Sequence, residues 1–368
     1  MRVAVTGSRG FIGANLVVRL RERPATEVME VHRNSGPMSF DDVDAVMHIS
    51  GVNRPTDPSG FTEGNAALTA NLAQALRATR RSIPVITSSS TQASLDNPYG
   101  ASKRAAEESL LAYARDTGAD VRIYRLTNVF GKWAKPNYNS AVATFCHNTV
   151  HGKPITVHDP AAPLRLVYVD DVCEAFMRAL DDFAGGTRGA GGFSEAGPIH
   201  DTNVGAVAST IAGFKRSRSE ATVDRVGIGL CRALYATYLS HIPATHFAYR
   251  PVRHIDPRGE FAEIVRSADS GQVSYFTAHP GITRGGHYHH TKNEKFLVLR
   301  GRARFRFRDM RSGATHEIEV CGSDPTVVET VPGWAHDITN IGEDDMLVML
   351  WANEAFDREH PDTIAAKL

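Results

Sequence analysis

The chain begins with the stretch Arg2-Val3-Ala4-Val5-Thr6-Gly7-Ser8-Arg9-Gly10-Phe11-Ile12-Gly13, in which a β-branched run leads into three glycines at the spacing GxxGxxG. Such a turn between a strand and a helix lets the backbone bend sharply and approach a ligand closely. The helix that follows offers free N–H groups and the positive end of its dipole to a pyrophosphate. The stretch therefore predicts a dinucleotide site. The residues expected to contact the cofactor here are Gly7, Arg9, Gly10, Phe11, Ile12 and Gly13.

Beyond this turn, short apolar runs alternate with helical stretches as far as about residue 180. The expected strands are 3–5, 45–49, 84–87 and 121–124, and the expected helices are 15–22, 63–79 and 102–116. This alternation predicts a doubly wound α/β domain around a parallel sheet. We expect this domain to occupy residues 1–243.

The pattern changes in the last third of the chain, where short β-rich runs are separated by glycines. The expected strands are 272–277, 295–299, 303–308, 317–320, 326–330 and 346–351. Their spacing predicts a small antiparallel barrel or sandwich, which we expect to occupy residues 244–368.

Composition narrows the class of protein. A chain of 368 residues suggests two domains, and its 41 basic and 41 acidic residues give a formal net charge of zero. This balance argues against a nucleic-acid-binding or membrane-surface protein. The chain enters a strand at once, without a signal peptide, and no apolar run approaches 18 residues. Four cysteines without CxxC spacing favour reduced thiols, so we expect a cytoplasmic protein.

The end of the second expected strand bears on the choice of cofactor. An acidic residue there would bind the ribose 2′-OH of NAD, whereas an arginine accommodates the 2′-phosphate of NADP. The sequence has Val31-His32-Arg33 at this place, with Arg9 as a second partner in the turn. Each arginine alone could be a solvated surface charge, but together they favour NADPH.

The segment Asn97-Pro98-Tyr99-Gly100-Ala101-Ser102-Lys103 predicts reduction chemistry. Asn97 and Pro98 are helix-start residues, and Tyr99 and Lys103 then share one helical face. A ketone that receives a hydride needs a proton donor, and a tyrosine can serve if a nearby cation lowers its pKa. A hydroxyl that orients the ketone is expected at the preceding strand end, where the sequence has Thr87-Ser88-Ser89-Ser90.

With these motifs in this order, residues 1–240 resemble the extended short-chain dehydrogenases/reductases. The resemblance implies that Ser90, Tyr99 and Lys103 are catalytic, with Ser89 as a second choice that contacts substrate. Tyr99 and Lys103 are also expected to contact the cofactor, Lys103 at the nicotinamide ribose. Residues 44–51 resemble the family's DxVxHxAG strand, which implies cofactor contacts at Ser50 and Gly51.

Two further segments resemble the same family. Residues 125–131 resemble its RxxNVxG segment and residues 165–172 its RxxVxVxD element, which implies that Asn128 and Arg165 contact the nucleotide sugar. Polar residues at strand or helix ends are the equally weighted alternative for both. One departure concerns the adenine pocket: only about a dozen residues follow Arg33 before the next strand, so a strand found in many relatives is expected to be missing or reduced.

A histidine cluster marks the second domain. Residues 281–301 fit the cupin pattern G-x5-H-x-H-x4-E-x6-G, and residues 332–340 supply its GxxHxxxN element. In a strand, His287 and His289 project to one face. Glu294 on the paired strand and His336 from a distant one would complete a site of three imidazoles and a carboxylate. Such a site suits zinc, iron, manganese or nickel, and zinc is our first choice.

One of these histidines, His287, also allows a second role, that of a catalytic base. Residues 256–263 and 284–287 resemble segments of the dTDP-4-keto-sugar 3,5-epimerase cupins, which implies that His287 removes a proton next to a ketone. A zinc-bound imidazole has its lone pair committed and cannot also be a free base. The sequence does not decide between these roles.

Over its whole length the chain resembles the bifunctional reductase/cupin enzymes of capsule and O-antigen synthesis, most distinctively at residues 130–140 and 287–296. The resemblance implies that the cupin epimerises C3 of UDP-2-acetamido-2,6-dideoxy-4-hexulose. The N-terminal domain would then reduce C4 with NADPH, giving UDP-2-acetamido-2,6-dideoxy-L-talose on the route to UDP-N-acetyl-L-fucosamine. The resemblance also implies that the protein forms a homodimer.

Two other functions stay open. One is an NAD(P)-dependent epimerase or dehydratase whose cupin only binds sugar or assists dimerisation. The other is a sugar-sensing protein with an inactive reductase fold.

Overall fold

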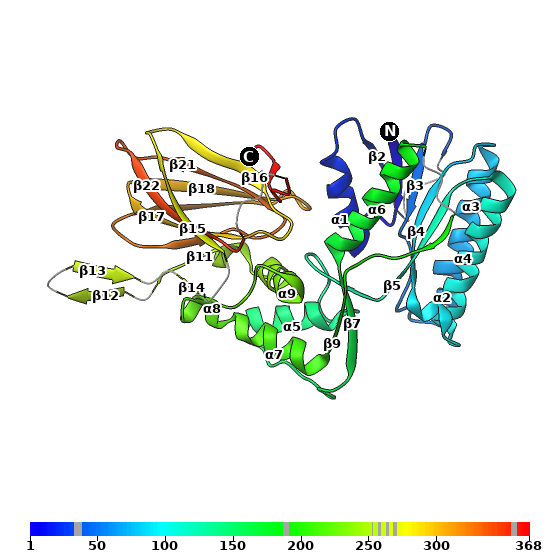
Figure 1. The fold of residues 1–368 in the computed structure, drawn as a ribbon, viewed down its shortest axis with the longest axis horizontal. Coiled ribbons are helices and arrows are strands. Elements are labelled where there is room, and N and C mark those ends of the chain that lie inside the picture. The colour runs from blue at the N-terminus through cyan, green and yellow to red at the C-terminus, as the bar shows by residue number, and fades with distance from the viewer. Residues whose placement is uncertain are drawn as a thin grey trace. The chain divides into compact units, whose positions relative to one another are not determined.

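A computed structural model describes residues 1–32, 39–186, 191–251, 253–256, 259–262, 265–267, 271–354 and 359–368 (Figure 1). The chain divides into two compact units, each made of two segments. The N-terminal unit comprises residues 1–130 and 164–201, and the C-terminal unit comprises residues 131–163 and 202–368.

The N-terminal unit is built on a six-stranded sheet with the order β2-β1-β3-β4-β5-β8, in which every pair is parallel. Its strands are β1 (Arg2–Thr6), β2 (Glu27–Val31), β3 (Ala45–His48), β4 (Val85–Ser90), β5 (Val121–Leu126) and β8 (Gly192–Ser194). The central strands are buried on both faces, as a parallel sheet requires.

Helices cover both faces of this sheet (Figure 1). Helices α1 (Phe11–Arg21) and α6 (Val169–Ala184) pack together on one face, and α3 (Leu68–Ala78) and α4 (Pro98–Thr117) pack together on the other. The short α2 (Ser59–Phe61) and the π-helical η1 (Thr62–Ala67) precede α3, and the 3₁₀ turn η2 (Thr91–Ser94) precedes α4. The predicted doubly wound fold is confirmed.

The strand expected to be missing or reduced after Arg33 is tested only in part, because residues 33–38 lie outside the described residues. The sheet has only β2 beyond β1, and the described residues between β2 and β3 contain no strand. A separate small sheet has the order β6 (Asn128–Phe130), β7 (Pro163–Tyr168) and β9 (Ile199–Asn203).

The C-terminal unit contains two five-stranded antiparallel sheets. The first has the order β11 (Ala248–Tyr249), β20 (Val327–Glu329), β17 (Glu294–Arg300), β22 (Met346–Ala352) and β15 (Gln272–Ala278). The second has the order β19 (Thr315–Cys321), β18 (Arg302–Asp309), β21 (Trp334–Asn340), β16 (Thr283–Tyr288) and β23 (Ile364–Ala365). Phe296 of the first sheet meets Phe305 of the second with ring centroids 5.6 Å apart, so the core lies between the sheets. The predicted antiparallel architecture is confirmed.

Two details of the prediction are wrong. His289 was expected on one strand with His287, but β16 ends at Tyr288, so His289 lies in the loop that follows. Glu294 was expected on the strand paired with the histidine strand, but β16 pairs with β21 and β23, whereas Glu294 begins β17 in the other sheet. The loop from Tyr288 to Glu294 crosses between the sheets instead of forming a hairpin, so Glu294 approaches the histidines from the opposite layer.

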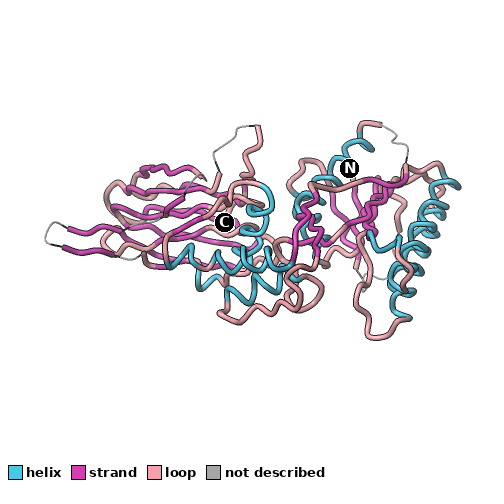
Figure 2. The backbone as a smooth tube through the Cα atoms, turned by 60° about the horizontal axis from the view of Figure 1, so that its bottom comes forward, coloured by secondary structure: helices cyan, strands magenta, loops and turns pink. Residues whose placement is uncertain are grey.

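Several helices belong to the C-terminal unit: α5 (Ala141–Val150), α7 (Val204–Phe214), α8 (Arg216–Ser219) and α9 (Gly229–Ser240). Figure 2 shows helices and strands together in this unit. Its remaining elements are η3 (Ala244–His246) and the short pairs β10 (Thr222–Val223) with β14 (Arg266–Ser267) and β12 (Arg253–Asp256) with β13 (Gly259–Ala262). Because both compact units are discontinuous in sequence, the division at residue 243 stays a prediction. Among the described helices, none is long and apolar enough to cross a membrane.

Candidate dinucleotide, catalytic and metal sites

The glycine turn is packed so closely that side chains do not fit. Gly7 has φ +70°, and a Cβ on it would lie 2.8 Å from the amide nitrogen of Ser50. A Cβ on Gly13 would lie 2.1 Å from the carbonyl oxygen of Gly7. Helix α1 starts at Phe11, and its N-cap Gly10 provides no side-chain cap. The first amides of the helix are therefore left for a ligand, which fits a dinucleotide pyrophosphate.

The residues expected around this turn are only partly described. Ser50 and Gly51 follow β3 and lie beside the turn, because β1 and β3 pair in parallel and end at the same sheet edge. Arg9 is exposed. Arg33 lies outside the described residues, so its expected contact with a 2′-phosphate remains a prediction.

The predicted catalytic residues come together where β4 ends and α4 begins. Ser90 is the last residue of β4, and the side chain of Asn97 caps α4 by accepting a hydrogen bond from the amide of Gly100 at 2.8 Å. The side chain of Ser90 lies close enough to that of Tyr99 to lower its pKa. The Lys103 Nζ lies 6.0 Å from the centroid of the Tyr99 ring and donates to the carbonyl oxygen of Ser88 at 3.3 Å.

Burial controls the protonation of this group. Burial raises the pKa of Tyr99, and the nearby Ser90 only partly opposes that rise. Burial lowers the pKa of Lys103 to about 8, although the nearby Glu107 acts in the opposite direction. Both groups therefore stay protonated at neutral pH, which suits a proton donor and a cation. The expected lowering of the Tyr99 pKa by Lys103 is not found in the protein alone.

Ser89 faces a different partner from Ser90. Its hydroxyl donates to the Glu107 carboxylate at 2.5 Å, and Arg125 binds the same carboxylate through two hydrogen bonds of 2.9 and 2.6 Å. The contact of Ser89 with substrate stays a prediction, since its hydroxyl already has this partner in the fold. Sequence patterns did not single out Glu107, although it lies one helical turn after Lys103 on α4.

Asn128 and Arg165 are neighbours across the pair of β6 and β7. The Asn128 Nδ2 donates to the carbonyl oxygen of Arg165 at 3.3 Å, and the Arg165 Nε donates to Asp201 at 3.0 Å. Both predicted residues are exposed and can face a ligand. Their predicted contact with a nucleotide sugar is not tested by these interactions.

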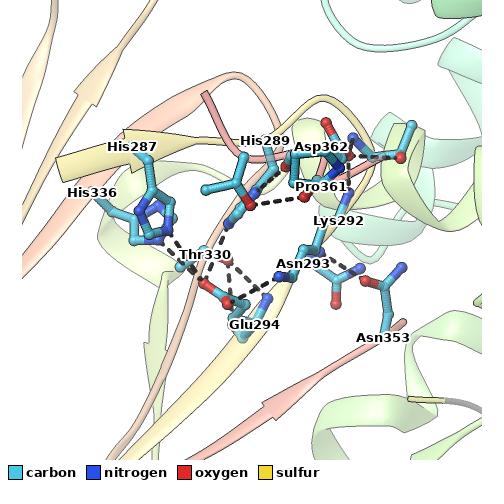
Figure 3. Close-up of polar contacts among 12 residues, drawn as sticks. His287, His289, Lys292, Asn293, Glu294, Thr330, His336, Asn353, Pro361 and Asp362 are labelled. Atoms are coloured by element: carbon cyan, nitrogen blue, oxygen red, sulfur yellow. Dashed lines mark hydrogen bonds and ion pairs between the residues drawn. The ribbon is translucent and has the colours of Figure 1, made fainter. Parts of the chain in front are cut away.

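The second site lies between the two sheets of the C-terminal unit (Figure 3). The ligand atoms of His287, His289, Glu294 and His336 all lie within 4.8 Å of one another. His287 and His336 are register partners on β16 and β21, and their ring centroids are 4.7 Å apart. The Glu294 Oε2 lies 3.3 Å from Nε2 of both His289 and His336. The four predicted ligands thus converge.

The hydrogen bonds of this group fit a bound cation. The Nδ1 of His289 donates to the carbonyl oxygen of Asp362 at 2.6 Å, so in the neutral ring Nε2 turns its lone pair toward the Glu294 carboxylate. Both nitrogens of the buried His336 have no hydrogen-bond partner. Orphaned acceptors this close to a carboxylate are expected where a metal ion lies between them.

Electrostatics support the same fit. Burial alone would raise the pKa of Glu294, but the three neighbouring histidines hold it well below its ordinary value. Burial lowers the pKa of His336 to about 4, which leaves its imidazole neutral. An ionised carboxylate and a neutral imidazole are the forms that bind a metal.

Two residues near this centre were not predicted. The Lys292 Nζ lies 3.7 Å from the Glu294 Oε1, and Asp362 binds His289 across 73 positions of sequence (Figure 3). Lys292 lies between His289 and Glu294 of the cupin pattern, so the sequence could have drawn attention to it. No local pattern points to Asp362, because its role depends on how the end of the chain folds back.

Comparison with known proteins defines the class. Residues 3–190 match the NAD dependent epimerase/dehydratase family, and residues 254–364 match the polysaccharide biosynthesis C-terminal domain. The chain is 51% identical to UDP-2-acetamido-2,6-beta-L-arabino-hexul-4-ose reductase of Pseudomonas aeruginosa over 372 aligned positions, covering 100% of this chain and 99% of that protein.

Solved structures agree with these matches. The crystal structure of the capsular polysaccharide assembling protein CapF from Staphylococcus aureus has a TM-score of 0.67 and 37% identity, and each chain is covered completely. UDP-N-acetylglucosamine 4-epimerase from Bacillus cereus shares the fold, with a TM-score of 0.53 and 21% identity over 65% of this chain and 96% of that chain.

Fold, sites and full-length matches together define an enzyme of the nucleotide-sugar reductase and epimerase class. The chain belongs to the NAD-dependent epimerase/dehydratase family, as the sequence motifs predicted. Family membership implies a nicotinamide dinucleotide, NAD or NADP, as the cofactor.

Replacing Gly13 with alanine is expected to weaken dinucleotide binding by about tenfold or more. The new Cβ would collide with backbone, not with a flexible side chain, so the turn that faces the pyrophosphate must shift. Cofactor titration followed by calorimetry measures the effect. Gly213→Ala is the matched control, because Gly213 also lies inside a helix but an added Cβ there would meet only the flexible side chain of Arg216, at 3.7 Å. Equal affinity in Gly13→Ala and wild type would contradict the assignment of the turn.

Proposed function

We propose that the chain is a bifunctional NADPH-dependent enzyme that acts on UDP-2-acetamido-2,6-dideoxy-4-hexulose. The cupin epimerises C3, and the N-terminal unit then reduces the C4 ketone to give UDP-2-acetamido-2,6-dideoxy-L-talose. The similarity to the Pseudomonas aeruginosa reductase over the whole chain supports a 4-keto UDP-sugar as substrate.

The observation that carries the reductase is the group at the start of α4. Ser90 at the end of β4 lies near Tyr99, and Lys103 lies on the same helical face as Tyr99, with its Nζ 6.0 Å from the ring centroid. When bound, NADPH supplies the hydride that adds to C4. The Tyr99 hydroxyl donates a proton to the developing alkoxide, Ser90 orients the ketone oxygen, and Lys103 supports the charge on the phenolate that remains.

The epimerase is proposed from the chemistry of the second site. A ketone at C4 acidifies the hydrogen at C3, so a base can remove it and a proton can return to the other face. A divalent metal, for which zinc is our first choice, would stabilise the enolate oxygen as a Lewis acid. Because His287 groups with the other three ligands, we propose it as a ligand and assign the proton transfer to another group.

One experiment tests the whole proposal. The protein is incubated with the UDP-4-keto sugar and NADPH in D2O, and the products are followed by NMR. We expect one NADPH consumed per sugar and deuterium incorporated at C3. Conversion of the sugar with no net use of NADPH would favour instead an epimerase or dehydratase with a non-catalytic cupin.

His336→Ala is expected to lower the metal content from nearly stoichiometric to background, because one of four converging ligands is lost. Metal analysis of the purified protein measures this. His279→Ala is the matched control, since His279 is exposed and pairs with Asp345 away from the four ligands. Unchanged metal content in His336→Ala would remove His336 from the site.

A further inference from the structure

We propose that Asp362 is a positioning residue of the metal centre, and that the segment 361–366, here called the C-terminal strap, orients His289 toward the other three ligands. This inference rests on the proposed metal centre. Asp362 does not itself contact the ligand atoms of the site, and its proposed effect is exerted through His289 and the loop that follows it.

The carboxylate of Asp362 binds the loop that leads from His289 to Glu294. Its Oδ1 accepts a hydrogen bond from the amide of His290 at 2.9 Å. Its Oδ2 accepts from the amides of Thr291 and Lys292, both at 2.8 Å, and from the Thr291 hydroxyl at 2.9 Å. One side chain thus satisfies three consecutive backbone amides of a loop that crosses between the two sheets (Figure 3).

The backbone of Asp362 binds the histidine itself. Its carbonyl oxygen accepts a hydrogen bond from Nδ1 of His289 at 2.6 Å. This bond fixes the tautomer and the ring orientation, and it directs Nε2 to a point 3.3 Å from the Glu294 Oε2. Partners of this kind commonly tune how tightly a histidine ligand holds its metal.

The strap is itself anchored to the strand that carries another ligand. Strand β23 pairs with β16, with Ala365 opposite His287 and Ile364 opposite Tyr288. The amide of Ala366 donates to the carbonyl oxygen of Gly286 at 2.8 Å. A short segment at the end of the chain therefore contacts the backbone next to His287 and the loop that holds His289.

The backbone of Asp362 is held in a conformation that few L-residues adopt. Its φ of +34° lies in the left-handed region, which aspartate tolerates better than most residues. In this conformation the carboxylate and the backbone carbonyl of Asp362 both bind residues 289–292. Such a residue persists only where its surroundings hold it, as the hydrogen bonds to its carboxylate and carbonyl oxygens do here.

The test compares the full-length chain with Asp362→Ala, Asp362→Asn and the control Asp345→Ala. Asp345 lies in the same unit and accepts a hydrogen bond from His279 at 2.7 Å, but it does not contact the metal ligands. Each apo protein is titrated with Co²⁺ and with Zn²⁺ in competition with a chromophoric chelator. The visible spectrum of bound Co²⁺ reports the ligand geometry.

We expect Asp362→Ala to weaken metal binding by about 10- to 100-fold and to change the Co²⁺ spectrum. Asp362→Asn keeps one acceptor oxygen and should restore part of the affinity. Asp345→Ala should match wild type. Tryptophan fluorescence during urea unfolding shows whether each variant is folded, and Asp362→Asn decides the question if Asp362→Ala is not.

Two different results would overturn the proposal, and they distinguish the positioning role of Asp362 from the metal centre itself. Wild-type affinity and spectrum in a folded Asp362 variant would overturn the positioning role while leaving the metal centre intact. A wild-type protein that binds neither Co²⁺ nor Zn²⁺ would overturn the metal centre, and the positioning role with it.

Discussion

Tyr99→Phe is expected to lower the rate of C4 reduction by about 10²- to 10⁴-fold while leaving the fold and the exchange of the C3 hydrogen in place. The change removes one oxygen atom, the proposed source of the proton that the developing alkoxide requires. The ring is kept, and so is its packing against Phe61, whose centroid lies 5.6 Å away. The loss should therefore appear in kcat for NADPH oxidation, with little change in cofactor affinity.

Deuterium exchange at C3, followed by NMR in D2O, separates this effect from the epimerase. Tyr113→Phe is the matched control, because Tyr113 lies on the same helix and donates its hydroxyl proton to the carbonyl oxygen of Ile83 at 2.9 Å. It should cost about 1 kcal/mol of stability and no activity. If Tyr99→Phe abolishes exchange together with reduction, the assignment of the two reactions to separate units is wrong.

The largest expected effect on stability comes from Glu329. This carboxylate joins two cations inside the C-terminal unit: it accepts hydrogen bonds from the Lys295 Nζ at 2.5 Å and from the Arg218 Nε at 2.9 Å. The side chains of Lys295 and Glu329 are fully buried. Lys295 also donates to the Tyr249 hydroxyl at 2.9 Å. The network thereby connects α8 and β11 to β17 and β20.

Glu329→Gln is expected to lower the free energy of unfolding of this unit by about 3–5 kcal/mol. Glutamine keeps the shape but removes the negative charge, so two cations remain without their buried counter-ion. Urea unfolding followed by tryptophan fluorescence measures the loss. All three tryptophans, Trp133, Trp334 and Trp351, belong to the C-terminal unit, so the signal reports this unit alone.

Glu319→Gln provides the control on the same barrel. Glu319 pairs with Arg302 at 3.5 Å, but both side chains are more than half exposed, so the loss should stay below about 1 kcal/mol. A loss in Glu329→Gln no larger than in Glu319→Gln would show that the buried pair is replaceable.

The stability of the wild type should also depend on pH through Glu329. Burial alone would raise the pKa of Glu329, but Lys295 and Arg218 lower it from 4.5 to about 2. A carboxyl whose pKa is lower in the folded state contributes stability above its unfolded pKa, and that contribution is lost as the pH falls through the folded value. Wild type should therefore lose stability between about pH 4.5 and 2, and Glu329→Gln should lack this component.

Much of both sites was predictable because their residues lie close together in sequence or follow a fixed spacing. The glycine turn and the Tyr99–Lys103 pair are defined by local geometry, a turn that excludes a Cβ and one helical face. The four metal ligands are marked by the fixed spacing of the motifs that carry them. The structure brings each of these groups together as expected. The positions of His289 and Glu294 were the exceptions, because the spacing does not reveal where a strand ends or which of two sheets the next strand joins.

The sequence by itself determined a parallel α/β unit with a dinucleotide turn, an antiparallel β unit with converging histidines, and the family to which the chain belongs. The two units follow from short-range sterics and from the periodicity of apolar residues, whereas the family was indicated by the resemblance of the motifs. Only the tertiary structure decided that Glu329 lies between two buried cations and that Asp362 holds His289. Both depend on contacts between segments 34 to 111 residues apart, which form when the chain packs and which leave no periodic trace in the sequence.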